Sequence, residues 1–118
     1  MPSTTIYKRG EVVLVPFPFT DLSSAKQRPA LVVSPDRWNA TQSDALLVAI
    51  TSQIPSILPP DDVLLSADDL QSSGLPKASL VRSTKLITIH QGLIRRSLGQ
   101  VSDQTLQTIL STLRSFLS

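Results

Sequence analysis

Apolar residues gather in short runs along most of the chain, and this pattern predicts a series of strands. The runs are rich in β-branched residues and are separated by polar or proline-containing stretches, as is typical of strands joined by surface loops. Pro16 and Pro18 lack ladder donors, so the first strand must lie at an edge, contain a bulge or end there. The expected strands cover residues 10–19, 30–34, 45–51, 62–65, 79–82 and 85–90.

The last segment, residues 102–117, predicts an amphipathic helix of about four turns. Ser102 suits the N-cap, and Asp103 suits the positive end of the helix dipole. Short strands followed by one terminal helix predict a mainly β fold, a small antiparallel β-barrel with a helical cover, in a single domain over residues 1–118. The apolar residues that recur at helical spacing are Leu106, Ile109, Leu110, Leu113 and Leu117.

The connections between these elements are polar or rich in proline. Residues 1–8 are expected to form a loose arm, residues 20–27 a surface loop, and residues 54–60, with three prolines, an irregular loop. Trp38 is expected to cover an edge of the core. The adjacent acidic pairs at 61–62 and 68–69 are expected in solvated turns.

The composition excludes several classes of protein but says little about which partner the protein binds. The 118 residues are 41% hydrophobic and contain no cysteine, which excludes a disulfide scaffold and thiol catalysis. No apolar run approaches the roughly 20 residues that span a bilayer, so a cytoplasmic protein without a membrane partner is the expectation. Residues 70–102 contain five basic residues and no acidic one. This segment predicts either a phosphate-binding surface or a solvated face balanced by nearby acids.

Most metal-dependent and nucleophilic mechanisms lack their residues in this chain. His90 is the only histidine, so neither a histidine pair for zinc nor a serine–histidine couple is available. No phosphate-binding glycine loop exists among four glycines. The expectation is therefore a site without metal or cofactor.

Two polar strand ends remain as candidates for chemistry, and we expect them to meet and form one polar site. Arg28 and Pro29 introduce an apolar run, and proline restricts the residue before it to extended conformations. Thr51 and Ser52 follow the next apolar run. An arginine fork and hydroxyl groups are suited to stabilise charge on a phosphate. From the residues alone, a surface ion pair is the more common explanation of an arginine such as Arg28, and a turn-capping hydroxyl is the more common explanation of Thr51.

Several segments, taken in order, resemble the MazF/PemK-like toxins of bacterial type II toxin–antitoxin systems. The resemblance covers the chain from about residue 8 onward. It is carried by the Arg-Gly-Glu-Val-Val-Leu-Val run at 9–15, the Gln-Arg-Pro-Ala-Leu-Val-Val-Ser run at 27–34, the Val-Ala-Ile-Thr-Ser-Gln run at 48–53, the Gly-Leu-Pro-Lys-Ala-Ser run at 74–79, the strand at 85–89, the Gly-Gln-Val-Ser run at 99–102 and the terminal helix.

The resemblance implies an SH3-like barrel that forms a homodimer and cleaves single-stranded mRNA without metal. In such toxins the ribose 2′-hydroxyl attacks the adjacent phosphate, and cleavage inhibits translation and growth until a cognate antitoxin neutralises the toxin. DNA would be contacted only indirectly, through the antitoxin. Arg28 and Thr51 occupy the family's catalytic positions, Arg28 as stabiliser of the transition state and Thr51 as hydroxyl donor to the phosphate.

The expected RNA contacts lie around that pair, and the chain departs from its relatives there. Many relatives have a longer loop where Ser23–Gln27 stands and different residues at Thr84, Ile87 and His90, so the resemblance does not extend to the cleavage sequence. The expected RNA-binding residues are Lys26, Gln27, Ser52, Gln53, Ser79, Thr84 and Lys85.

Two other functions compete with RNA cleavage. A gyrase-directed toxin of the CcdB-like kind would use the same barrel, with the end of the terminal helix engaging gyrase. A barrel that only binds RNA or peptide would retain RNA without forming products.

Overall fold

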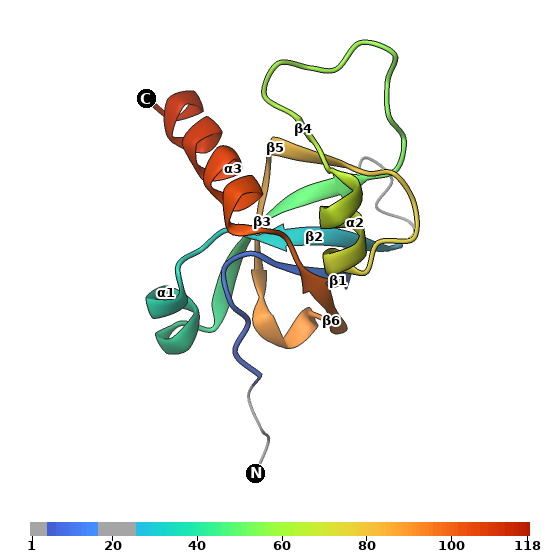
Figure 1. Ribbon diagram of the computed structural model, residues 1–118. Coiled ribbons are helices and arrows are strands. Elements are labelled where there is room, and N and C mark those ends of the chain that lie inside the picture. Colours follow the sequence, from blue (N-terminus) through green and yellow to red (C-terminus); the bar gives the residue numbers. More distant parts are fainter. Residues whose placement is uncertain (1–4, 17–25) are drawn as a thin grey trace.

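Six antiparallel strands form one curled sheet in the computed structural model, which describes residues 5–16 and 26–118. Their order across the sheet is β4-β5-β3-β2-β1-β6, and the sheet bends into a half-barrel (Figure 1). The strands are β1 (Glu11–Pro16), β2 (Gln27–Val32), β3 (Asp44–Thr51), β4 (Val63–Leu64), β5 (Leu80–His90) and β6 (Arg96–Gln100). The helices are α1 (Asp36–Thr41), α2 (Ala67–Ser73), the short 3₁₀ helix η1 (Gln91–Leu93) and α3 (Asp103–Phe116).

Both faces of the sheet are buried, because successive residues of each strand point to opposite sides. On β2, Leu31 packs with α3 on the helix side, whereas Ala30 and Val32 pack on the second side. Strand β3 divides in the same way, with Val48 on the helix side and Leu47 on the second. The mainly β fold with a C-terminal helix that the sequence predicts is confirmed.

The terminal helix begins and ends close to its predicted limits. Ser102 accepts a hydrogen bond from the backbone N–H of Thr105 (3.2 Å), as an N-cap does. Three apolar residues of the predicted stripe, Leu106, Ile109 and Leu113, are buried against the sheet. The sequence predicts that Leu117 packs on the sheet with the rest of the stripe. That expectation is wrong, because Leu117 is 71% exposed at the C-cap of α3.

Strand β5 replaces two expected strands. The polar residues 83–84 suggest a break, but the chain stays extended from Leu80 to His90. Val48 of β3 pairs with Leu86 of β5, but the next residue, Ala49, pairs with Arg82. Residues 83–85 therefore form a bulge, which bends the strand without ending it.

Strand β2 starts earlier than expected, at Gln27, because β1 supplies partners for residues 27–29. Arg28 thus lies in a strand, opposite Val15, and not in the loop before it. The β2–β3 ladder starts only at Ala30, so no bond to β3 requires the N–H that Pro29 lacks. Residues 17–19 of the first expected strand, and most of the expected loop at 20–27, lie outside the described residues.

The expectation of a loose arm at residues 1–8 is wrong at Tyr7, which is 7% exposed. Its N–H donates to Gln91 Oε1 (3.2 Å) and its carbonyl accepts from Asn39 Nδ2 (3.0 Å). Asn39 also accepts from the Ser34 hydroxyl (2.6 Å). This buried polar network joins the arm to α1 and η1. Each of these buried polar groups thereby has the hydrogen-bond partner that burial requires.

A second buried polar cluster joins α2 to α3 and corrects the expected solvated turn at 68–69. Asp69, 3% exposed, accepts from the Ser102 N–H (2.8 Å) and from the hydroxyls of Thr105 and Ser66. Burial alone would raise the pKa of Asp69, but the hydrogen bonds from Thr105, Ser102 and Ser66 outweigh it and hold the pKa below its usual range.

Within the described residues, no helix has the length and apolar character that crossing a membrane requires.

Candidate active site at the ends of strands β2 and β3

Arg28 and Thr51 come together because β2 and β3 are antiparallel neighbours. Ala30 pairs with Ala49, and the same register continued by two residues sets Arg28 opposite Thr51. The alternation of a strand also places both side chains on the face of Ala30 and Ala49. The sequence expectation that these two strand ends meet is therefore confirmed by their register, whereas their catalytic role stays a prediction.

The hydroxyl of Thr51 is oriented by the chain that follows it. Its oxygen accepts the backbone N–H of Gln53 (3.1 Å). A hydroxyl that accepts in this way keeps its own hydrogen for donation. Thr51 is half-buried, so that hydrogen can reach a ligand in the solvent-facing hollows beside it.

Two hollows flank the pair, one on each face of the sheet end. The smaller hollow, of about 190 Å³, lies on the second side and adds Gln53, Arg82 and Lys85. The larger hollow, of about 510 Å³, lies on the helix side and is continued by the α2–β5 connection and by β6. Arg28, Ile50 and Thr51 line both hollows. Arg28 and Thr51 therefore form the rim between them.

The other predicted RNA contacts divide between these hollows or lie outside them. Lys85 and Gln53 line the smaller hollow, while Ser52 and Ser79 line the larger one. The Ser79 side chain is buried, and its hydroxyl donates to the Lys77 carbonyl (2.9 Å), so it holds the loop. The three remaining residues are not among the described lining residues of either hollow: Lys26, Gln27 and Thr84.

Arg82 brings a charge that is already balanced. Its Nε lies 2.9 Å from Oδ2 of Asp62, whose side chain is only 3% exposed. The expectation of a solvated turn at 61–62 is therefore wrong for Asp62. The ion pair fixes the Arg82 side chain at the edge of the smaller hollow, and the other cationic residues of its described lining are Arg28 and Lys85.

Sequence reasoning missed two basic residues of the larger hollow, Lys77 and Arg96. They come from the α2–β5 connection and from β6, which lie at separate places in the chain. The available signal was the segment without acidic residues at 70–102, which contains both.

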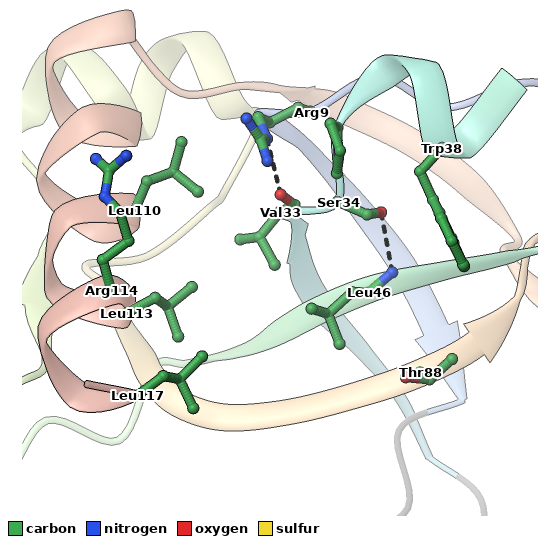
Figure 2. A pocket seen from close by; sticks show the side chains of 11 residues that line it. Arg9, Val33, Ser34, Trp38, Leu46, Thr88, Leu110, Leu113, Arg114 and Leu117 are labelled. Carbon is green, nitrogen blue, oxygen red and sulfur yellow. Dashed lines mark hydrogen bonds between the residues drawn. The ribbon is translucent and has the colours of Figure 1, made fainter.

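A third cavity, of about 480 Å³, lies away from Arg28 and Thr51, between α3, α1 and the sheet; we call it the α3 groove. Figure 2 shows Leu110, Leu113 and Leu117 pointing from α3 toward Leu46 and Trp38. Trp38 keeps 44% of its surface exposed while its indole N–H donates to the Asp44 carbonyl (3.0 Å), so it covers the core edge only in part. Arg9 and Arg114 are the charged residues among the described groove lining.

The family model described as "PemK-like, MazF-like toxin of type II toxin-antitoxin system" matches residues 8–117. The match covers nearly the whole chain, so the protein belongs to this toxin family. No curated protein is significantly similar to it in sequence.

Solved structures of the same fold agree with that assignment. An "Endoribonuclease from Mycobacterial species" is 24% identical, with 97% of this chain and 93% of that chain covered and a TM-score of 0.75. An endoribonuclease in complex with its cognate antitoxin, also mycobacterial, is 24% identical, with 94% of each chain covered and a TM-score of 0.74. A MazE–MazF structure from Deinococcus radiodurans is 23% identical, with 96% and 97% covered and a TM-score of 0.76.

Proposed function

We propose that this toxin is an endoribonuclease that cleaves single-stranded mRNA without a metal ion. The observation that carries the proposal is the β2–β3 register, which sets an arginine opposite an oriented hydroxyl at the rim of two open hollows. The endoribonuclease activity named for the structural relatives supports it.

The reaction is a transesterification at phosphorus. The ribose 2′-oxygen loses its proton as it bonds to the adjacent phosphorus, and the bond from phosphorus to the 5′-oxygen breaks. That 5′-oxygen takes up a proton, so the products are a 2′,3′-cyclic phosphate and a 5′-hydroxyl. Negative charge gathers on the non-bridging oxygens in the transition state, where preorganised donors contribute most.

Arg28 and Thr51 supply these donors in different ways. The Arg28 guanidinium is planar, and its paired N–H groups match two phosphate oxygens. Thr51 donates the one hydrogen that its bond with Gln53 leaves available. The Arg28 guanidinium carries hydrogen-bond donors and no acceptor atom, so its role in this proposal is to stabilise the negative charge.

The direct test incubates the purified protein with single-stranded RNA in excess chelator and analyses the product ends. Cyclic phosphate and 5′-hydroxyl ends are expected. The absence of cleavage overturns the proposal. RNA retained without products would indicate the binding-barrel alternative, and inhibited supercoiling would indicate the gyrase-directed alternative.

An antitoxin with an acidic, partly disordered segment is the proposed partner, and the α3 groove is its proposed docking surface. The groove presents leucines and a tryptophan between Arg9 and Arg114, and no described lining residue is acidic. Arg114 forms no ion pair with a described residue, and Arg9 uses its Nε to bond the Val33 carbonyl (2.8 Å). Apolar side chains flanked by carboxylates complement this surface.

Trp38 is the only tryptophan, so its fluorescence reports on the groove. We expect a short neighbouring gene that encodes an acidic, partly disordered protein, and absence of such a gene counts against the proposal. The product of that gene is the probe. We expect it to shift the Trp38 emission, and we expect Leu117→Asp to abolish binding while the exposed control Arg37→Asp on α1 leaves it unchanged. Unchanged emission and equal binding by Leu117→Asp contradict this docking surface.

The proposed homodimer is tested separately by light scattering of the free protein. Loss of the dimer in Leu117→Asp would assign the α3 groove to a second copy of the chain instead of the antitoxin.

A further inference from the structure

The larger hollow is continuous with Arg28 and Thr51, yet the proposed RNA cleavage reaction does not itself require this hollow. It opens from Arg28 and Thr51 toward Leu98 on β6 and the α2–β5 connection, and encloses about 510 Å³. Small-molecule sites in proteins typically span about 300–1,000 Å³. A single nucleotide of an RNA strand whose phosphate sits at the rim therefore fits in this hollow.

The charges of the larger hollow match a nucleotide strand. Lys77 and Arg96 are exposed, and neither side chain forms an ion pair or hydrogen bond with any other described residue. None of the described lining residues is acidic. Two uncompensated cations beside a site for phosphoryl chemistry favour a polyanion, and their contacts release counterions from RNA.

The remaining wall of the larger hollow is apolar and suits a base. Unpaired RNA bases are splayed out and pack on protein surfaces, while their phosphates contact cations. The apolar residues of this wall come from four strands and the α2–β5 connection, and two of them, Ile50 and Leu75, belong to the buried core on the helix side. The apolar residues of the wall are Leu14, Pro29, Ile50, Leu75, Pro76 and Leu98.

The α2–β5 connection is held against β6 by a close backbone approach. Gly74 has a φ of +72°, and a Cβ at this position would lie 2.2 Å from the Leu98 carbonyl oxygen. Glycine therefore allows the connection to contact β6 directly. This contact brings Lys77 and Arg96 into the lining of one hollow although they are 19 positions apart.

We propose that the larger hollow is a nucleotide-binding subsite, in which Arg96 and Lys77 hold the phosphates of a nucleotide next to the cleaved bond and the apolar wall receives its base. The inference rests on the proposed function. The RNA crosses the rim formed by Arg28 and Thr51, with one neighbouring nucleotide in the larger hollow and the strand on the other side in the smaller hollow with Lys85.

The test compares Arg96→Gln and Lys77→Gln with a matched control, Arg95→Gln. Arg95 carries the same charge one residue away, is exposed, and is not among the described lining residues of the larger hollow. The probe is an RNA oligonucleotide that the wild-type protein cleaves, together with its analogue carrying 2′-deoxyribose at the cleaved position for binding measurements.

Arg96→Gln is expected to weaken binding of the analogue roughly 5- to 20-fold and to reduce the slope of log K against log salt by about 0.7, the value for one phosphate contact on a single strand. KM for the cleavable RNA rises while kcat stays within about twofold, because the contact is made equally in the ground state and the transition state. Lys77→Gln behaves in the same way, and Arg95→Gln does not.

Equal binding and equal salt slopes for Arg96→Gln and Arg95→Gln overturn the subsite. This failure is distinct from failure of the proposed function, in which the wild-type protein does not cleave RNA at all. If RNA binds without cleavage, the unmodified oligonucleotide serves as the binding probe and the same variants decide the subsite. If no RNA binds, both proposals are overturned.

Photo-crosslinking locates the base independently of affinity. A 4-thiouracil next to the cleaved position is expected to crosslink to peptides that contain residues 74–79 or 96–98. Crosslinks confined to peptides of the smaller hollow contradict the subsite.

Discussion

Arg28 and Thr51 lie two residues beyond Ala30 and Ala49, the pair at which the β2–β3 ladder ends. Ala30 is fully buried and Ala49 is 2% exposed, so the two strands are fixed up to this point. Beyond it the side chains reach solvent on both faces of the sheet. The ladder between β2 and β3 thus ends in two polar residues, and the buried strands fix where they begin.

Removal of the arginine is expected to affect the chemical step. Arg28→Ala should lower kcat for RNA cleavage about 10²- to 10³-fold, as loss of one oxyanion donor does. Arg28→Lys should recover only part of the loss, because an ammonium lacks the planar fork. Single-turnover cleavage measures both, with Arg37→Ala on α1 as the exposed control. Wild-type rates in Arg28→Ala would exclude its role.

The hydroxyl of Thr51 is tested by a pair of substitutions that separate its shape from its hydrogen bond. Thr51→Val keeps the volume and removes the hydroxyl, and should lower kcat at least about tenfold, the lower range for one lost donor. Thr51→Ser keeps the hydroxyl that Gln53 orients. It should stay within a few-fold of wild type. Equal activity of the valine and serine variants would argue for a purely structural hydroxyl.

Asp69 links stability to pH. The pKa of Asp69 is lower in the folded protein than in the unfolded chain. Its carboxylate therefore stabilises the fold fully at pH values above the unfolded-state pKa of about 4, and this stabilisation is lost as the pH falls through the folded-state pKa. Asp69→Asn should cost about 1–3 kcal/mol at pH 7. The difference from wild type should shrink below pH 4. Denaturant unfolding across pH 2–7 measures it, with exposed Asp68→Asn as the control, and a constant difference would contradict the assignment.

Asn39 holds the N-terminal arm through its amide. Asn39→Ala removes the partners of the Tyr7 and Ser34 carbonyls and of the Ser34 hydroxyl, and should destabilise the fold by about 2–4 kcal/mol. Urea unfolding should show this loss, whereas Gln42→Ala, at an exposed position of the same region, should change stability by less than about 0.5 kcal/mol. A small effect in Asn39→Ala would mean that water replaces its contacts.

Gly74 positions one wall of the larger hollow. Gly74→Ala places a Cβ against the Leu98 carbonyl at a positive φ, and should cost about 1–3 kcal/mol or more. The displaced connection should also weaken RNA binding. Gln71→Ala on α2 is the control, because alanine is favourable at an exposed helical position. Unchanged stability in Gly74→Ala would show that the connection can move away from β6 freely.

The sequence predicts the elements well where local pattern alone determines them. Helix α3 follows from its cap and apolar spacing, and the junction of Arg28 with Thr51 follows from two apolar runs that end in polar residues. Asp69 had a usable signal as well, since Ser66 and Asp69 have the spacing of a capping box at the start of α2.

Tertiary contacts determine what the sequence could not predict. Strand β5 stays continuous across its polar residues because β3 pairs with it on both sides of the bulge. Lys77 and Arg96 share a hollow only because β6 pairs with β1 and Gly74 allows the α2–β5 connection to contact Leu98. Neither relationship leaves a periodic signal in the chain.

Strand β5 lines two separate cavities of the toxin. One strand carries Arg82 and Lys85 into the smaller hollow and Thr88 into the α3 groove. A displacement of β5 therefore moves a wall of both cavities at once. A partner seated in the α3 groove would thus contact the same strand that lines the smaller hollow beside Arg28 and Thr51.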